Sequence, residues 1–522
     1  MIKPISISSV NRDKTSQNDP RFKGLLEVAV SGLQACEANP MLNVTVLDLL
    51  TAIAPRTFIE GQTNPYAGLE AFRRESSGLI INCLIPGVIV AGVAKLIQGQ
   101  MMGGKTQMAS CWANEDTINL VTDYWNKAKG SNNEEKIKDT IRKILNDTKG
   151  VDGDELKSFA GIDFEASIDT LAKKSSKDEV NKAIKAIVEK THISENIRIA
   201  RQKGEGHFSQ SLKDVLENAP KILRELIAGK NPDTFAQKAT RLVTAKSVAG
   251  LGIIIPLAIM AQPINRWITA KTSGKKGAPI YKDFEHSDEK QLSSKEKAAL
   301  TRQKFISVGS MVGIALLSIM KMPSIAMLKG IAQFKGIFPS MDQARIISTA
   351  TFASRMAASE DKNDLRESTV RDIATFSAFY FLGDYVAKGI ATVIQKTKGI
   401  KLINVLKETP KDANFLKKSW YWAKHTALKS SDEVYGATEA LTKQAKTIRG
   451  ACQLGNIAFS LVALGLVIPK MYRNKTDKAR EKELKDMGVD KKIIDKYYPA
   501  FEMSMKGKTP RKTLNSFAAC KN

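Results

Sequence analysis

The stretch "SVAGLGIIIPLAIMAQPIN" (residues 247–265) contains no charged side chain. A helix that crosses the hydrocarbon core of a bilayer needs ~20 predominantly apolar residues, so this stretch predicts a membrane-spanning helix. Several such runs in one chain indicate an all-α, multi-pass membrane protein, while a set of buried core helices in a large soluble protein is the alternative. The other runs are "SGLIINCLIPGVIVAGVA" (77–94), "FISVGSMVGIALLSIM" (305–320) and "ACQLGNIAFSLVALGLVIP" (451–469).

The prolines inside these runs add a structural requirement. Pro256 and Pro263 each remove a backbone donor from the helix that 247–265 would form. In lipid the freed carbonyl oxygens must find a partner on a neighbouring helix or on water. We therefore expect this helix to pack against others.

A fifth apolar run, residues 373–394, carries two charged side chains, Asp384 and Lys388. A charge within a membrane segment is costly and usually faces the interior of a bundle, a cavity or a partner. Asp384 is therefore the strongest single-residue functional candidate. The alternative is an interfacial carboxylate paired with Lys388 four residues later on the helix.

The formal net charge of +26 is distributed unevenly. Residues 114–240 hold 22 basic and 22 acidic side chains, so the whole excess lies elsewhere, among the apolar runs. The loop 266–304 has 10 basic and 5 acidic residues, and the tail 470–522 has 15 and 7. Basic residues beside apolar runs are typical of contacts with anionic headgroups. Aromatic residues make up only 7% of the chain, which disfavours a nucleic-acid partner.

These patterns divide the chain into seven parts. The region 105–240 is expected to be a soluble insert of amphipathic helices, with helices in 133–147, 166–190 and 211–229. The first three parts are a polar segment 1–39, a first repeat 40–104 with span 77–97, and the insert 105–240. The part 241–338 follows, with spans 247–265 and 305–321 around the basic loop 266–304. The last three parts are a second repeat 339–400 with span 373–394, an amphipathic connection 401–450, and a final part 451–522 with span 451–469 and a basic tail.

Two distant regions share residues in the same order. Residues 40–56 and 339–355 align without a gap and both end in arginine, Arg56 and Arg355. Downstream, "RESS" (74–77) is matched by "REST" (366–369), which places Arg74 and Glu75 opposite Arg366 and Glu367. Each RES motif is interpreted as the start of a helix, with its arginine at the headgroups. The shared order predicts an internal duplication, and the parallel and inverted forms both remain open.

The orientation of the chain is not fixed by these patterns. The positive-inside rule places both the loop 266–304 and the tail 470–522 in the cytoplasm, which requires an even number of spans between them. The expected spans 305–321, 373–394 and 451–469 make three. Either one of them does not cross, or "SIAMLKGIAQFKGIF" (324–338) also crosses. The first residues contain no cleavable apolar signal, and we expect a multi-pass protein of a bacterial-type cytoplasmic membrane.

One stretch resembles the phosphate-binding loop of nucleotide-hydrolysing enzymes. "GQMMGGKT" (99–106) fits the pattern through Gly99, Gly104, Lys105 and Thr106. A working loop needs a short buried strand before it and the N-terminus of a helix after it. The preceding run is far longer than a strand, so we expect Gly103 and Gly104 to end a helix and Lys105 to meet headgroups.

The remaining chemistry-bearing residues form no recognisable site. The four histidines and five cysteines are scattered, so no metal or cofactor is predicted. We therefore expect a non-enzymatic integral membrane protein, either a transporter or channel or a membrane scaffold. Its partners would be the bilayer and other membrane proteins, including copies of itself. The alternatives are a P-loop-type nucleotide-binding enzyme, and a peripheral basic protein that binds anionic lipid or nucleic acid.

Overall fold

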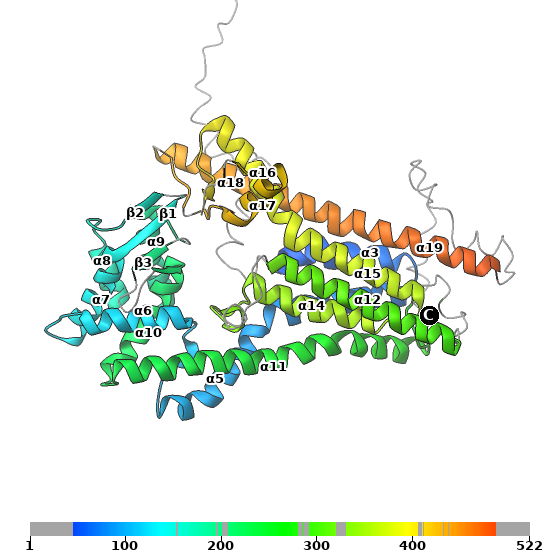
Figure 1. The fold of residues 1–522 in the computed structure, drawn as a ribbon, viewed down its shortest axis with the longest axis horizontal. Helices are drawn as coiled ribbons and strands as arrows, with labels where there is room; N and C mark the ends of the chain where they lie inside the picture. The colour runs from blue at the N-terminus through cyan, green and yellow to red at the C-terminus, as the bar shows by residue number, and fades with distance from the viewer. Residues whose placement is uncertain are drawn as a thin grey trace, which may run out of the picture.

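The computed structural model describes residues 45–486 as an elongated, mostly helical molecule (Figure 1). A folded insert lies at one end and a helical bundle at the other, and one long helix, α11 (Pro232–Ser273), runs through both. The prediction of a mostly helical protein is confirmed. Short segments within this range are outside the described residues: 153–154, 195–196, 201–206, 280–283, 285–291, 320–329, 406–409, 411, 432 and 437.

The bundle consists of helices from both halves of the chain, several of which continue through π-helical turns. Wider π-helical turns leave some backbone groups out of the usual ladder and often occur at functional positions. The π-helical segments are Leu49–Ile53, Ile80–Leu84, Ala378–Leu382 and Leu461–Val467. The other helices are α3 (Ala54–Gly61), α4 (Pro65–Leu79), α5 (Pro86–Met102), α12 (Ser294–Ile319), α14 (Met341–Ala357), α15 (Lys362–Ser377), α16 (Gly383–Lys398), α18 (Glu439–Ser460) and α19 (Ile468–Asp486).

Helix α11 has its polarity reversed relative to a helix of a soluble protein. Along its second half, the buried positions recur every three or four residues and are mostly small or polar. The opposite face is apolar and exposed. The buried set is Ser247, Gly250, Ile254, Ala258, Gln262, Asn265 and Thr269. The exposed set includes Val248, Ile253, Leu257, Met260, Ile264 and Trp267.

The two prolines do not interrupt α11, because neighbouring helices pack against it. Pro263 leaves the carbonyl oxygen of Ile259 without its helical donor, and the hydroxyl of Ser354 on α14 donates a hydrogen bond to that oxygen. The expectation that packing would satisfy a freed carbonyl is met here. Helix α11 also packs along α4, α5 and α14.

In the part of the chain that the structure describes, two helices are long and apolar enough to cross a membrane by length and composition: Pro232–Ser273 and Glu439–Ala479. A third candidate is the pair Pro65–Leu84 and Pro86–Met102, which is bent by 45° at Ile85. Among the described residues, the expected spans 305–321 and 373–394 are not in this group. In the first case the N-terminal half of α12 is charged. In the second case the residues 373–394 are shared between α15, a π-helical turn and α16, with charged side chains on each side of the turn.

The insert folds around its own core. The helices expected at 133–147, 166–190 and 211–229 are present, but the expectation of a purely helical insert is wrong, because it also holds an antiparallel sheet of order β2-β1-β3-β4. The strands are four or five residues long, too short to show an alternating pattern in the sequence. The elements are α6 (Glu115–Lys127), α7 (Asn133–Asp147), β1 (Thr148–Asp152), β2 (Glu155–Ser158), α8 (Glu165–Ala172), α9 (Lys177–Thr191), β3 (Ile197–Ala200), β4 (His207–Gln210) and α10 (Leu212–Ile227).

A second, smaller insertion follows α16 and contacts the first. It consists of the hairpin β5 (Ile403–Val405) and β6 (Thr426–Leu428), with α17 (Phe415–His425) between the strands. The backbone N–H of Ser194 in the first insert donates to the carboxylate of Glu433, and the ring of His192 stacks on Tyr435 at 3.7 Å between centroids. Both insertions therefore lie at the same end of the bundle (Figure 1).

Two glycines on α5 provide a test of this packing. A methyl group at Gly87 would overlap the backbone of Ile337, while one at Gly92 would have no neighbour within 4 Å. We expect Gly87→Ala to destabilise the protein by at least ~1–3 kcal/mol, the usual cost of overpacking. Gly92→Ala should be neutral or stabilising by up to ~1 kcal/mol, because alanine favours a helix over glycine. Thermal unfolding of the two variants in detergent measures the difference, and equal stability would contradict the close approach at Gly87.

Candidate functional site: a buried charge network in the bundle

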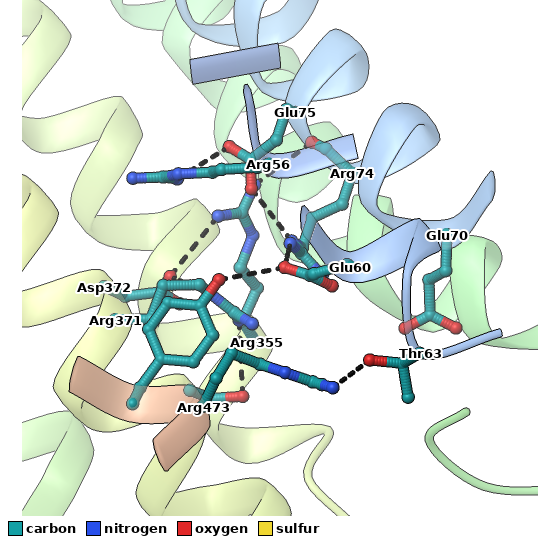
Figure 2. A network of polar contacts seen from close by, with 12 residues as sticks. Arg56, Glu60, Thr63, Glu70, Arg74, Glu75, Arg355, Arg371, Asp372 and Arg473 are labelled. Carbon is teal, nitrogen blue, oxygen red and sulfur yellow. Dashed lines mark hydrogen bonds and ion pairs between the residues drawn. The ribbon is translucent and has the colours of Figure 1, made fainter. Parts of the chain in front are cut away.

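Charged side chains from five helices converge inside the bundle (Figure 2). Each is less than a tenth exposed, although the outside of the bundle at this level carries exposed Phe58, Phe72 and Trp267. The site is therefore a polar interior behind an apolar surface. Its members are Arg56 and Glu60 on α3, Arg74 and Glu75 on α4, Arg355 on α14, Arg371 and Asp372 on α15, and Tyr472 and Arg473 on α19.

Arg74 is the centre of the first part of the network. Its guanidinium binds two carboxylates, with Nη2 at 2.6 Å from Glu60 Oε1 and Nε at 2.9 Å from Glu75 Oε1. Arg56 Nη1 reaches the second oxygen of Glu75 at 3.1 Å. Two arginines and two glutamates of α3 and α4 thus form one connected set of charge-assisted hydrogen bonds.

The second part repeats this arrangement with α14 and α15. Arg355 Nη1 lies 3.5 Å from Asp372 Oδ1, and the neighbouring Arg371 places Nε 3.0 Å from the same oxygen. In both parts an arginine from the preceding helix and the arginine next to the carboxylate share one acid. Arg355 corresponds to Arg56, and the pair Arg371–Asp372 corresponds to Arg74–Glu75.

Two hydrogen bonds join the parts directly. Arg56 Nη2 donates to the hydroxyl of Thr375 on α15 at 2.6 Å, and Arg355 Nη2 donates to the backbone carbonyl of Arg74 at 3.1 Å. Each part therefore supplies one arginine that crosses to the other. The network fixes α3 and α4 against α14 and α15.

Helices α11 and α19 close the network from outside. Tyr472 Oη donates to Glu60 at 3.0 Å, and Arg473 donates to the hydroxyl of Thr63. Arg266 on α11 lies 3.2 Å from Glu70 and 2.9 Å from Asp364, which are at the starts of α4 and α15. Helices α11 and α19 thus each contribute a charged side chain.

Two glycines allow α3 and α4 to approach each other closely. The α-carbon of Gly61 lies only 2.8 Å from where a Cβ on Gly68 would be, so α3 and α4 approach more closely than side chains would permit. Asn64 caps α4 by accepting a hydrogen bond from the Ala67 N–H. The tight turn between the helices brings Glu60 within reach of Arg74.

The charges balance, but not every oxygen is bound. Six arginines face six carboxylates when Arg266, Glu70, Asp364 and Glu367 are included. Three buried acidic oxygens, Glu70 Oε2, Glu367 Oε2 and Asp372 Oδ2, have no hydrogen-bond partner among the described residues. Breaking one member of a buried pair leaves its partner charged and unpaired, which is costly. The formal charges of the network therefore cancel, while three of its acidic oxygens accept no hydrogen bond from the described residues.

The sequence identified part of this site and assigned it the wrong role. The RES motifs are not helix starts: residues 74–77 lie late in α4 and 366–369 lie inside α15. Arg74 and Glu75 are buried in the network, as is Glu367, but Arg366 donates instead to the carbonyl of Lys475 near the surface. The contacts of Arg74 with Glu75 resemble those of Arg371 with Asp372 instead. The spacing from Arg56 to Glu75 nearly equals that from Arg355 to Asp372, which was the missed signal.

The other two charged candidates, Asp384 and Lys388, are only partly described. Asp384 lies on α16, but its side chain is outside the described part of the chain. Lys388 is buried, and its Nζ lies 3.4 Å from the carbonyl oxygen of Ala423 on α17. The expected pairing of Asp384 with Lys388 therefore stays a prediction.

The stretch 99–106 has the geometry of a helix end. Gly103 adopts a left-handed conformation, and the N–H groups of Gly103 and Gly104 both donate to the carbonyl of Gly99. A phosphate loop needs such groups free and pointing at its ligand. Lys105 and Thr106 follow the C-terminal end of α5, where the helix dipole is unfavourable for an anion. The expectation that these glycines end a helix is met.

A carboxylate accepts a hydrogen bond from the first backbone N–H after this stretch. The N–H of Gln107 donates to Glu225 Oε1 at 2.7 Å. Burial alone would raise the pKa of Glu225, but the hydrogen bonds from Gln107 and Lys230 outweigh it, so its pKa is lowered and the group stays negative. A negative charge here repels a nucleotide.

No group of histidine, cysteine or carboxylate side chains within the described ranges could hold a metal ion. Comparison with protein-family models, with curated proteins and with solved structures finds no match. The interpretation of the site therefore rests on its own geometry.

The shared glutamate provides a test of the network. We expect Glu75→Gln or Arg56→Met alone to destabilise the protein by ~3–5 kcal/mol, because each leaves a buried charge without its partner. The double variant should cost clearly less than the sum of the two. Arg142→Met breaks the exposed pair with Glu165 and should cost under ~1 kcal/mol. Thermal unfolding in detergent measures all four, and additive single costs would refute the coupling.

Proposed function

We propose that the chain is an integral membrane protein that crosses the bilayer several times and displays its folded insert on one side. The observation that carries this proposal is the reversed polarity of α11, whose exposed face is apolar and whose buried face is small and polar. Such a surface would be unfavourable in water, where contiguous apolar patches of this extent mark interaction or membrane surfaces. Lipid is the solvent in which it is stable.

The buried charge network supports the same proposal. Charged side chains within membrane segments face the interior of a bundle and pair with one another, as Arg74 does with Glu60 and Glu75. Exposed apolar side chains on other helices extend the apolar belt, among them Phe305, Ile306 and Leu317 on α12 and Val462 and Leu466 in the π-helical turn before α19. A soluble basic protein would carry its charges on the outside.

We propose that the two halves are copies of one unit with the same orientation. The first copy comprises α3, α4–α5 and α11, and the second comprises α14, α15–α16 and α18–α19. Each has a π-helical turn after its second helix and a left-handed glycine, Gly103 or Gly399, where the third segment ends. An insertion follows each of these glycines, and the two insertions contact each other. Contact at one end favours a parallel over an inverted duplication.

This arrangement gives the chain a consistent orientation. Between the basic stretch 266–304, which joins α11 to α12, and the tail, the bundle holds α12, α14, the pair α15–α16 and the pair α18–α19, which would be four passes. The fourth pass, which the apolar runs of the sequence do not include, would be α14, because its arginines interrupt the apolar pattern. The loop and the tail then lie on one side, as the positive-inside rule requires, and the insert lies on the other. A bacterial-type cytoplasmic membrane remains a prediction.

The role we favour for this design is a membrane scaffold. The insert has its own core, a balanced charge and direct contacts with the second insertion, so it is held at a fixed position relative to the bundle. A neutral network of paired charges would hold the helices in a single arrangement. The protein would present the insert to partners at the membrane surface.

Extraction and labelling test the membrane proposal together. Alkaline carbonate should leave the full chain in the membrane pellet, because a spanning protein is not released. An impermeant maleimide should label Cys introduced at Lys276 and Cys introduced at Lys182 from opposite sides of sealed vesicles, in a variant without native cysteines. Release by carbonate would end the proposal, and labelling of both sites from one side would end the proposed orientation.

A second candidate function is ion-coupled transport, favoured by the unpaired acidic oxygens of Glu367 and Asp372 inside the bundle. Carboxylates in membrane interiors are used to bind protons and cations. A transporter with repeated halves would bind its ion where the halves meet.

Flux measurements separate this candidate from the scaffold. In proteoliposomes, Glu367→Gln and Asp384→Asn should each reduce a proton- or cation-dependent flux at least tenfold while membrane insertion is unchanged. Glu439→Gln, at the exposed start of α18, is the matched control. Absence of flux in the unmodified protein, or flux that both variants retain, would exclude this transport function and favour the membrane scaffold.

A further inference from the structure

Helix α17 carries an unusual surface for a short helix. Its sequence, "FLKKSWYWAKH" (415–425), combines three lysines and two tryptophans with no acidic residue. Phe415 is 80% exposed, Leu416 is 76% exposed and Trp420 is 48% exposed. Aromatic and basic residues together are typical of helices that lie at the membrane interface.

A cavity of about 930 Å³ lies beside α17. Its far wall is formed by Ile314 and Leu317 of α12 and by Leu382 and Tyr385 at the start of α16. The near wall is formed by one face of α17, from Phe415 to Ala423. This volume is within the ~300–1,000 Å³ range of pockets that hold small molecules.

The cavity is continuous with the apolar surface of the bundle. Leu317 is 66% exposed, Leu382 is 49% exposed, and Leu316 and Phe379 beside them are also exposed. A ligand could therefore enter from the region where lipid chains would surround the bundle. The walls are almost entirely apolar, with Lys418, Ser419 and Ser377 as the polar members.

Contacts with α16 fix the position of α17. The Trp422 ring stacks on Tyr385 at 6.4 Å between centroids, and the carbonyl of Ala423 lies 3.4 Å from the buried Lys388 Nζ. The flanking hairpin β5–β6 closes the insertion at its base. The helix is thus held as one wall of a preformed cavity, with its lysines near the level of the insertions.

We propose that this cavity is a binding site for an anionic phospholipid, with an acyl chain between α12 and α17 and the phosphate at Lys418. The proposal rests on the proposed membrane function and adds a specific ligand to it. Charge complementarity selects the anionic headgroup, because α17 carries Lys417, Lys418 and Lys424 and no acid. The apolar walls select a chain, and a nucleotide or an acidic peptide would leave them uncovered.

Tryptophan quenching tests the site in the full chain. In a background that combines Trp112→Phe and Trp267→Phe, the tryptophans that lipid can reach are Trp420 and Trp422, since Trp125 is buried in the insert. The purified protein in detergent is titrated with phosphatidylglycerol or phosphatidylcholine that carries dibrominated chains, whose bromine quenches indole fluorescence on contact. We expect half-maximal quenching at a concentration at least threefold lower for phosphatidylglycerol.

Variants identify the residues responsible. Lys417→Ser with Lys418→Ser should remove the preference for phosphatidylglycerol, and Trp420→Phe should reduce the quenched fraction. Lys182→Ser removes a charge from the exposed face of α9 and should change neither. The lysines are exposed, so their loss should leave the fold intact, which circular dichroism checks.

The outcomes separate this inference from the membrane proposal. Equal quenching by both lipids, a preference that survives the lysine variants, or no quenching would each overturn the lipid site. If carbonate still leaves the protein in the pellet, the membrane proposal stands without it. Release by carbonate would overturn both.

Discussion

The fold depends on the guanidinium of Arg74, which lies where the two halves of the bundle meet. The guanidinium nitrogen atoms bind Glu60 and Glu75, and the backbone carbonyl of Arg74 accepts a hydrogen bond from Arg355 of the other half. Removing two charges from water costs several kcal/mol per ion, which only close geometry and additional hydrogen bonds offset. The helices around Arg74 must therefore keep a single arrangement, and the glycines that bring α3 against α4 serve that requirement.

A buried ion pair is weak evidence for stability, because apolar side chains of the same volume are often as stable or more so. Its better-supported use is to fix which helices pair and in which register. That use suits a bundle in lipid, where apolar surfaces of helices have little reason to prefer each other over lipid chains. The crossed contacts of Arg56 with Thr375 and of Arg355 with Arg74 specify the pairing of the halves.

Some elements could be predicted from the sequence because they depend on local patterns. The apolar run 247–265 and the amphipathic run 133–147 have the periodicity that defines their helices, and both are present. The short strands β1 to β4 and the helix α14 were missed. The strands owe their existence to pairing with one another, and α14 carries arginines that only its buried partners make tolerable.

The site was recognised in part for the same reason. Arg56 and Arg355 each pair with a carboxylate 17 to 19 residues away that lies on the next helix, so the periodicity of a single helix does not relate the partners. The letters "RES" repeat by identity, whereas Glu75 and Asp372 correspond by chemistry. Either aspartate or glutamate can bind two guanidinium groups at this position, provided that its helix places the carboxylate between them. Matching by charge and spacing, rather than by letter, would have placed Arg371 and Asp372 opposite Arg74 and Glu75.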